Sequence, residues 1–179
     1  MEVPIITRED IENAYSLSKN INQTRIDPHI LRAQRFDLRP ILGSYLYNQF
    51  INGLQVTTPE QRWLDLLNGK EYLSQNNNTV FFYGAKPVVV SYAFSRIMLN
   101  NNSNVTRGGN TSKTTAESTP QTSKSDAYRI TAAKQDGVQY AAGLTQFLDD
   151  NRVTYPEYGQ GLDSNTGKKQ SIGFFNASR

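Results

Sequence analysis

The sequence predicts an all-α fold, a small bundle of four to five helices with a long polar arm and an extended C-terminal tail. Apolar residues recur at helical spacing in several segments that open on a capping residue or a first-turn proline. Two other stretches lack this pattern: residues 101–124 are dominated by Asn, Ser, Thr and Gly, and residues 152–179 have no period. A chain of 179 residues with a mean hydropathy of −0.59 fits one body with polar appendages.

These patterns divide the chain into four parts. Residues 1–100 form the first part of the helical body, and residues 101–124 form the arm. A long helix over residues 125–151 completes the body, and residues 152–179 form the tail.

The organising element is the stretch Phe81–Leu99, in which apolar side chains occupy nearly every side of a helix from Val88 onward. Such a helix must be covered on most sides. Gly84 supplies the turn into it, and Pro87 suits its first turn.

Start signals place the other helices. Thr7 caps the first, Asp27-Pro28 opens the second, and Thr58-Pro59 opens a further short one. Pro40 would clash inside an unbroken helix, so we expect a break there and a new helix capped by Asp37.

The long helix carries small residues four apart at Ala133, Gly137 and Ala141. This spacing lets another helix approach closely, and the central helix is the expected partner. Gly137 is therefore predicted to be a structural position.

The two appendages are the candidate interaction elements. The arm holds Val105, Thr106, Arg107 and Lys113, and Gly108-Gly109 suits the turn of a possible β-ribbon. The tail holds four aromatic residues that resemble anchors for another surface, although a frayed terminus is the alternative. These residues are Tyr155, Tyr158, Phe174 and Phe175.

Composition excludes several classes of protein. The net charge is +3, but basic residues are spread: residues 1–100 hold ten Lys/Arg against nine Asp/Glu, and residues 101–179 hold nine against seven. This spread argues against a protein that reads DNA sequence. The absence of cysteine excludes disulfides and thiolate zinc sites. Without a secretory pattern or a membrane-length apolar run, we expect synthesis in the cytoplasm and no membrane partner.

No motif for catalysis, metal or cofactor binding stands out. The single histidine, His29, follows a first-turn proline and favours a surface or capping role over a general base. Glu9, Asp10 and Glu12 favour a solvated first helical turn over a metal site. The segment Gly161–Lys169 departs from a phosphate loop in glycine spacing and has lysine where the Mg²⁺-binding hydroxyl belongs. We expect no catalytic residue, no metal, no cofactor and no enzyme activity.

Four segments resemble a family of tailed-phage head-to-tail connector proteins, of the type found in crAss-like and other phages of Bacteroidetes. The resemblance lies in helix starts, glycines and arm residues over roughly residues 5–160. The segments are Ile26–Tyr47, Phe81–Asn102, Asn104–Thr119 and Leu144–Gly159.

The resemblance implies a virion structural protein in the phage neck. Its subunits would form a ring, expected to be dodecameric, beneath the portal, where it extends the DNA channel and contacts passing DNA non-specifically. The arm around Arg107 and Lys113 would touch the portal protein or a neighbour, and the tail from Tyr155 would reach an adjacent subunit or the next neck or tail ring. A neck stopper, a tail-completion ring and a non-viral helical protein-binding module are the alternatives.

Overall fold

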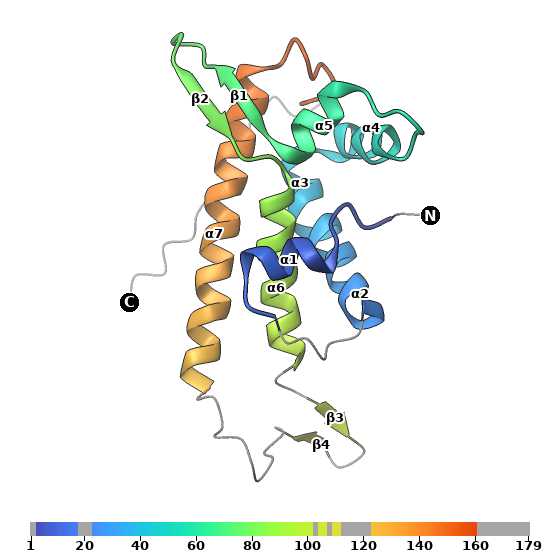
Figure 1. Ribbon diagram of the computed structural model, residues 1–179, viewed down its shortest axis with the longest axis vertical. Coiled ribbons are helices and arrows are strands. Elements are labelled where there is room, and N and C mark those ends of the chain that lie inside the picture. The colour runs from blue at the N-terminus through green and yellow to red at the C-terminus, as the bar shows by residue number, and fades with distance from the viewer. Residues whose placement is uncertain (1–2, 18–22, 102–103, 107–108, 112–122, 161–179) are drawn as a thin grey trace, which may run out of the picture.

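The computed structural model describes residues 3–17, 23–101, 104–106, 109–111 and 123–160 (Figure 1). It is mainly helical, as predicted, and it contains two short antiparallel hairpins. The hairpin in the arm matches the possible β-ribbon, whereas the other was not predicted, so the expected all-α description is too narrow. Within the described segments, no helix combines the length and apolar character needed to cross a bilayer.

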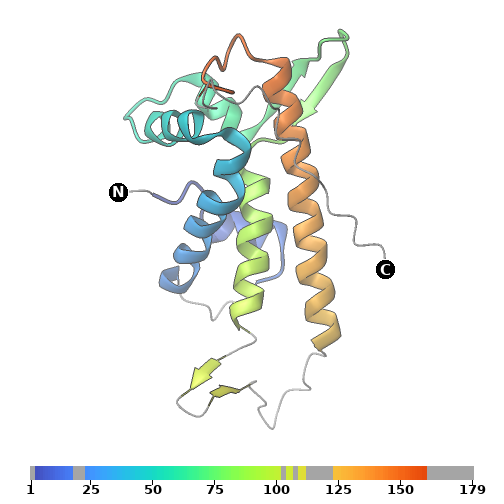
Figure 2. The same ribbon diagram turned by 180° about the vertical axis from the view of Figure 1, so that it is seen from behind.

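Two long helices, α6 (Lys86–Asn101) and α7 (Ser123–Asp150), form the scaffold and run side by side (Figures 1 and 2). With 28 residues, α7 is about 42 Å long. The two helices approach closely because position 137 has no side chain: a β-carbon on Gly137 would lie 2.8 Å from the Tyr92 ring. Ala133, one turn earlier, is buried. The predicted contact between these two helices is confirmed.

Helix α6 is covered on most sides, as its composition predicts. Helix α7 packs along one side, and α1 (Arg8–Ala14) and α2 (Gln23–Ala33) pack against others. The hydroxyl of Ser95 donates to the Tyr92 carbonyl at 2.8 Å, which satisfies it within the helix. The buried residues of α6 are Val88, Val89, Val90, Ser91, Ala93, Phe94, Ser95 and Ile97.

A tight turn leads into α6. Gly84 has φ +87°, and a β-carbon there would lie 2.4 Å from the carbonyl oxygen of Leu67. The Ala85 N–H then donates to the Leu66 carbonyl at 2.8 Å. Pro87 is the second residue of the helix, where its missing N–H has no partner to lose. The predicted roles of Gly84 and Pro87 are confirmed.

The N-terminal helix α1 begins where the sequence predicts. Thr7 and Asp10 form a reciprocal capping box: the Asp10 N–H donates to the Thr7 hydroxyl, and the Thr7 N–H donates to the Asp10 carboxylate at 2.7 Å. The preceding chain is held by the buried amide of Gln34. Its Oε1 accepts from the Ile5 N–H at 2.8 Å, and its Nε2 donates to the Val3 carbonyl at 3.3 Å.

The helix that begins as α2 does not break at Asp37, so that prediction is wrong. The Arg39 N–H donates to the Gln34 carbonyl five residues back, which makes a π turn. This wider turn accommodates Pro40 without ending the helix. Asp37 forms an ion pair with Arg96 on α6, at 2.5 Å. The continuation of α2 consists of η1 (Gln34–Leu38) and α3 (Arg39–Leu42).

Beyond α3 the chain builds one end of the molecule. The unpredicted hairpin pairs Lys70 with Phe82 and Tyr72 with Val80. Its inner face packs on α7, where the Phe82 ring stacks on Phe147 at 4.0 Å. Phe81 and Phe82 therefore belong to a strand, although the sequence analysis placed them at the start of the central helical stretch. The elements are α4 (Ser44–Leu54), α5 (Gln61–Asn68), β1 (Lys70–Leu73) and β2 (Thr79–Phe82).

Candidate functional site

The outer face of the β1–β2 hairpin exposes apolar side chains to solvent. Leu73 is 64% exposed, Phe81 54% and Tyr83 60%. The Phe81 and Tyr83 rings meet edge to face at 5.0 Å, and Tyr83 meets Tyr140 of α7 at 5.8 Å. We call Leu73, Phe81 and Tyr83 the hairpin face. Adjacent exposed apolar side chains of this kind mark a surface suited to contact another protein.

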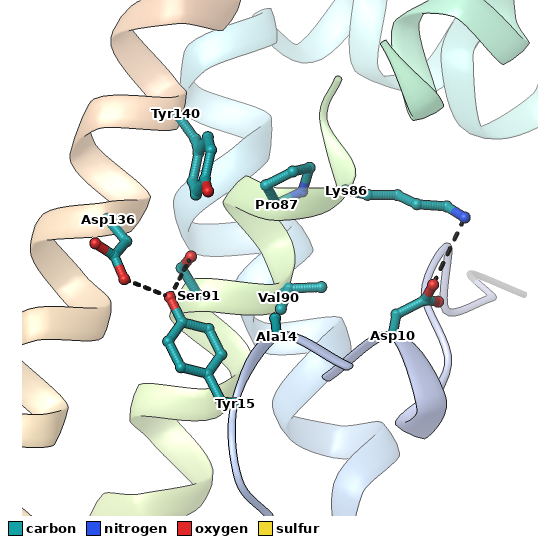
Figure 3. A pocket seen from close by; sticks show the side chains of 9 residues that line it. All are labelled: Asp10, Ala14, Tyr15, Lys86, Pro87, Val90, Ser91, Asp136 and Tyr140. Carbon is teal, nitrogen blue, oxygen red and sulfur yellow. Dashed lines mark hydrogen bonds and ion pairs between the residues drawn. The ribbon is translucent and has the colours of Figure 1, made fainter. Parts of the chain in front are cut away.

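A half-open pocket of about 340 Å³ lies between α1, α6 and α7 (Figure 3). At its centre, the Tyr15 hydroxyl donates to Asp136 at 2.8 Å and lies 3.0 Å from the Ser91 hydroxyl. Because the phenol has one proton to give, Ser91 donates to Tyr15. Lys86 and Asp10 form an ion pair at 3.7 Å across the mouth.

The chemistry of this pocket is that of a structural link. Burial raises the pKa of Tyr15 to about 12, and the hydrogen bond to Asp136 acts in the same direction, whereas the bond to Ser91 lowers the pKa. The phenol is therefore neutral at physiological pH. Its ring also stacks on Phe94 at 4.5 Å. Tyr15 thus fastens the end of α1 to both scaffold helices.

The raised pKa of Tyr15 predicts that the folded protein becomes less stable at alkaline pH. The pKa of Tyr15 is raised from 10 to about 12 in the folded chain, so its contribution is complete below pH 10 and lost as the pH rises toward 12. We expect Tyr15→Phe to flatten the fall in the free energy of unfolding between pH 9 and 11.5, measured by denaturant titration. Tyr128→Phe, on a ring that is 76% exposed, is the control. If the fall in the free energy of unfolding became equally shallow in both variants, Tyr15 would not be the group responsible for it.

The arm forms a hairpin where the structure describes it. Strand β3 (Asn104–Thr106) pairs with β4 (Gly109–Thr111) in antiparallel register, and it lies beyond the ends of α6 and α7 opposite β1–β2 (Figure 1). Val105 and Thr106 are in β3. The other two predicted arm contacts, Arg107 and Lys113, lie outside the described residues.

The predicted tail is not extended at its start, and Tyr155 is not a free anchor. Residues 151–160 form successive turns that fold back on the body. Tyr155 is 1% exposed, and its ring packs on Trp63 at 6.3 Å and Phe147 at 5.6 Å. Its hydroxyl donates to the Arg62 carbonyl at 2.8 Å. The prediction that Tyr155 contacts a partner is therefore wrong.

Charged contacts hold the same turns in place. Arg62 forms an ion pair with Glu157 at 2.9 Å and donates to the Thr154 carbonyl at 3.3 Å. Tyr158 is half-buried beneath Arg152, whose guanidinium lies 5.7 Å from the ring centre. Tyr158 therefore keeps only part of its surface for a partner. The remaining tail residues, Phe174 and Phe175, lie outside the described residues.

The described residues contain no group of three or more metal-binding side chains. His29 is half-buried, and both of its ring nitrogens lie 3.4 Å from the Asn100 amide. Burial lowers the pKa of His29, and the positive charges of Arg32 and Arg96 lower it further. No nucleophilic side chain of the described part of the chain is hydrogen-bonded to His29. The loop Gly161–Lys169 lies outside the described residues.

Sequence reasoning missed the hairpin face. A signal was present, because the segment from Thr79 to Tyr83 is rich in β-branched and aromatic residues and follows three asparagines typical of a turn. The apolar run continues into α6, and this continuity concealed the strand.

Comparison with known proteins gives a family without an assigned role. No curated protein and no solved structure matches the chain. A family model does match residues 38–167, which is more than half of the chain and extends from the end of η1 through α7 and the turns that follow. The chain therefore belongs to DUF6712, a family of unknown function.

Proposed function

We propose that this protein is a subunit of the ring that joins a tailed-phage capsid to its tail, seated beneath the portal around the DNA channel. The resemblance of four segments to connector proteins supports this role. In this proposal the helices form a bundle that makes the wall of the ring. The arm around β3 and β4, with Arg107 and Lys113, contacts the portal protein or a neighbouring subunit.

The hairpin face is the observation that carries the proposal. Its aromatic side chains are more than half exposed in the single chain, although Tyr72 and Phe82 on the inner face of the hairpin are buried. Covering apolar surface is worth about 25 cal/mol per Å², so contact with a second subunit stabilises an assembly. The two hairpins also lie at opposite ends of the scaffold (Figure 2), which suits a subunit placed between two layers of a neck.

Assembly is the property to test. We expect Phe81→Ser/Tyr83→Ser to shift the protein from rings to monomers, and to abolish its addition to rings of the portal protein from the same phage. Mass photometry at several concentrations, with and without portal rings, measures both effects. Tyr128→Ser removes an aromatic ring that is 76% exposed on α7, and it should assemble normally.

Three outcomes contradict the proposal. The wild-type protein could remain monomeric at every concentration even with portal rings present. The double variant could assemble as well as the wild type, or the Tyr128→Ser control could lose assembly equally.

A further inference from the structure

The outward side of the α2–η1–α3 helix carries a band of arginines. Four exposed arginines occur along it, spaced by seven, three and four residues. Its opposite side is apolar and faces the core through residues such as Ile26, Ile30 and Leu38. We call the four residues the arginine band: they are Arg25, Arg32, Arg35 and Arg39.

No carboxylate on the same helix balances the charges of Arg25, Arg32 and Arg39. Asp37 is engaged with Arg96 on α6, and Asp27 is half-buried and accepts from the Gln23 amide at 2.6 Å. Among the residues that the structure describes, no carboxylate forms an ion pair with Arg25 or Arg32. The field of Arg32 also contributes to the lowered pKa of the neighbouring His29.

The band ends in a polar hollow of about 390 Å³ between this helix and α4. Arg39 is positioned there by hydrogen bonds from Nε and Nη2 to the Ser44 hydroxyl, at 3.3 and 3.2 Å. Among the described residues, no carboxylate lines the hollow; its lining supplies guanidinium and carboxamide N–H groups, which are donors suited to phosphate oxygens. The lining residues are Arg35, Arg39, Tyr47, Asn48, Ile51, Asn52 and Gln55.

We propose that the arginine band binds the phosphate backbone of duplex DNA. Arg25 and Arg39 are separated by about 21 Å along the helix, which is the length of about six base pairs. Phosphate contacts of this kind give affinity without reading bases. The inference deepens the proposed function by assigning the side of the subunit that faces the channel, and it rests on that proposal only for its biological setting.

The test is binding of a fluorescent 25-base-pair duplex of mixed sequence, followed by anisotropy between 50 and 200 mM salt. Four phosphate contacts predict a slope of log K against log salt of about −3.6, or about a 150-fold loss of affinity over this range. We expect Arg25→Gln/Arg32→Gln to halve that slope. Both side chains are exposed, and unchanged fluorescence of Trp63 confirms that the variant is folded.

Lys134→Gln/Arg152→Gln is the matched control, because it removes the same charge from two exposed positions on and after α7. It should keep the wild-type slope. An equal change in the two double variants would show a general charge effect and overturn the assignment. So would base-selective binding, or the absence of wild-type binding at 50 mM salt.

The two proposals fail separately. Rings that form normally but bind no DNA would refute the arginine band as a DNA surface and leave the connector proposal standing. If the Arg25→Gln/Arg32→Gln variant instead failed to bind another neck protein, the band would serve an acidic protein surface. If the protein bound DNA through the arginine band but never assembled, the connector proposal would be refuted and the arginine band would stand as a DNA surface.

Discussion

Phe147→Ala is expected to lower the free energy of unfolding by about 3–5 kcal/mol, the usual cost of deleting a fully buried aromatic ring. Phe147 is 0% exposed. Its ring stacks on Phe82 and meets the edges of Tyr72, at 5.1 Å, and Tyr155, at 5.6 Å. One side chain therefore joins α7, the β1–β2 hairpin and the turns after α7. Urea titration followed by circular dichroism and by Trp63 fluorescence measures the loss.

Phe81→Ala is the control for this experiment. Phe81 is the strand neighbour of Phe82 but points to the outer face, where it is 54% exposed. Its replacement should change the free energy of unfolding of the monomer by about 0.5 kcal/mol or less. If the two variants lost similar stability, the inner and outer faces of the hairpin would be assigned the wrong way round.

Gly84→Ala is expected to destabilise the fold strongly for two reasons. The backbone at Gly84 has φ +87°, which costs about 1–3 kcal/mol for a residue with a side chain. The added methyl would also lie 2.4 Å from the Leu67 carbonyl oxygen and 2.6 Å from the Gly69 nitrogen. Both neighbours are backbone atoms, so the turn into α6 must move. The midpoint of thermal unfolding reports the loss.

Gly143→Ala makes the same chemical change in a different setting. Gly143 lies inside α7, and apart from its chain neighbours and the surrounding helix backbone, no atom of the described residues lies within 4 Å of the position that its β-carbon would take. We expect a gain of about 0.5–1 kcal/mol, because alanine favours the helix more than glycine does. A loss in Gly143→Ala, or a neutral Gly84→Ala, would contradict the local geometry.

Local signals predicted most of the helices but misplaced two starts, because α2 begins at Gln23, ahead of Asp27-Pro28, and α5 begins at Gln61 after Glu60 rather than after Thr58. The Thr7 cap, the Gly84 turn, the Pro87 start and the close approach at Gly137 each depend on one or two neighbouring residues, and the structure confirms all four. The predicted break at Asp37 was wrong because a helix can accommodate Pro40 either by ending before it or by widening into a π turn, and the sequence does not distinguish the two. The chain took the π turn, which keeps the helix and leaves Asp37 free to meet Arg96.

Partner surfaces were predicted less well than the helices. An aromatic residue in a segment without periodicity needs to be buried. The sequence does not say whether residues of the same chain or of a partner chain cover its ring. Tyr155 is covered by Trp63 and Phe147 of the same chain.

The arginine band was overlooked for a different reason. Counting charges over residues 1–100 hid the fact that four of the arginines fall between residues 25 and 39 on one exposed helix side.

The π turn also explains how this helix keeps a regular buried seam. Its buried positions 26, 30, 34, 38 and 42 repeat every four residues, whereas an α-helix completes a turn in 3.6. Each repeat would swing the seam about 40° around the axis, so that by Leu42 it would face well away from Ile26. The extra residue in η1 unwinds about 100° of that drift and returns Leu38 and Leu42 to the core. Buried positions spaced four residues apart next to a proline therefore indicate a locally underwound helix. Deleting one residue from this segment would rotate Leu38 and Leu42 out of the core and expose them to solvent.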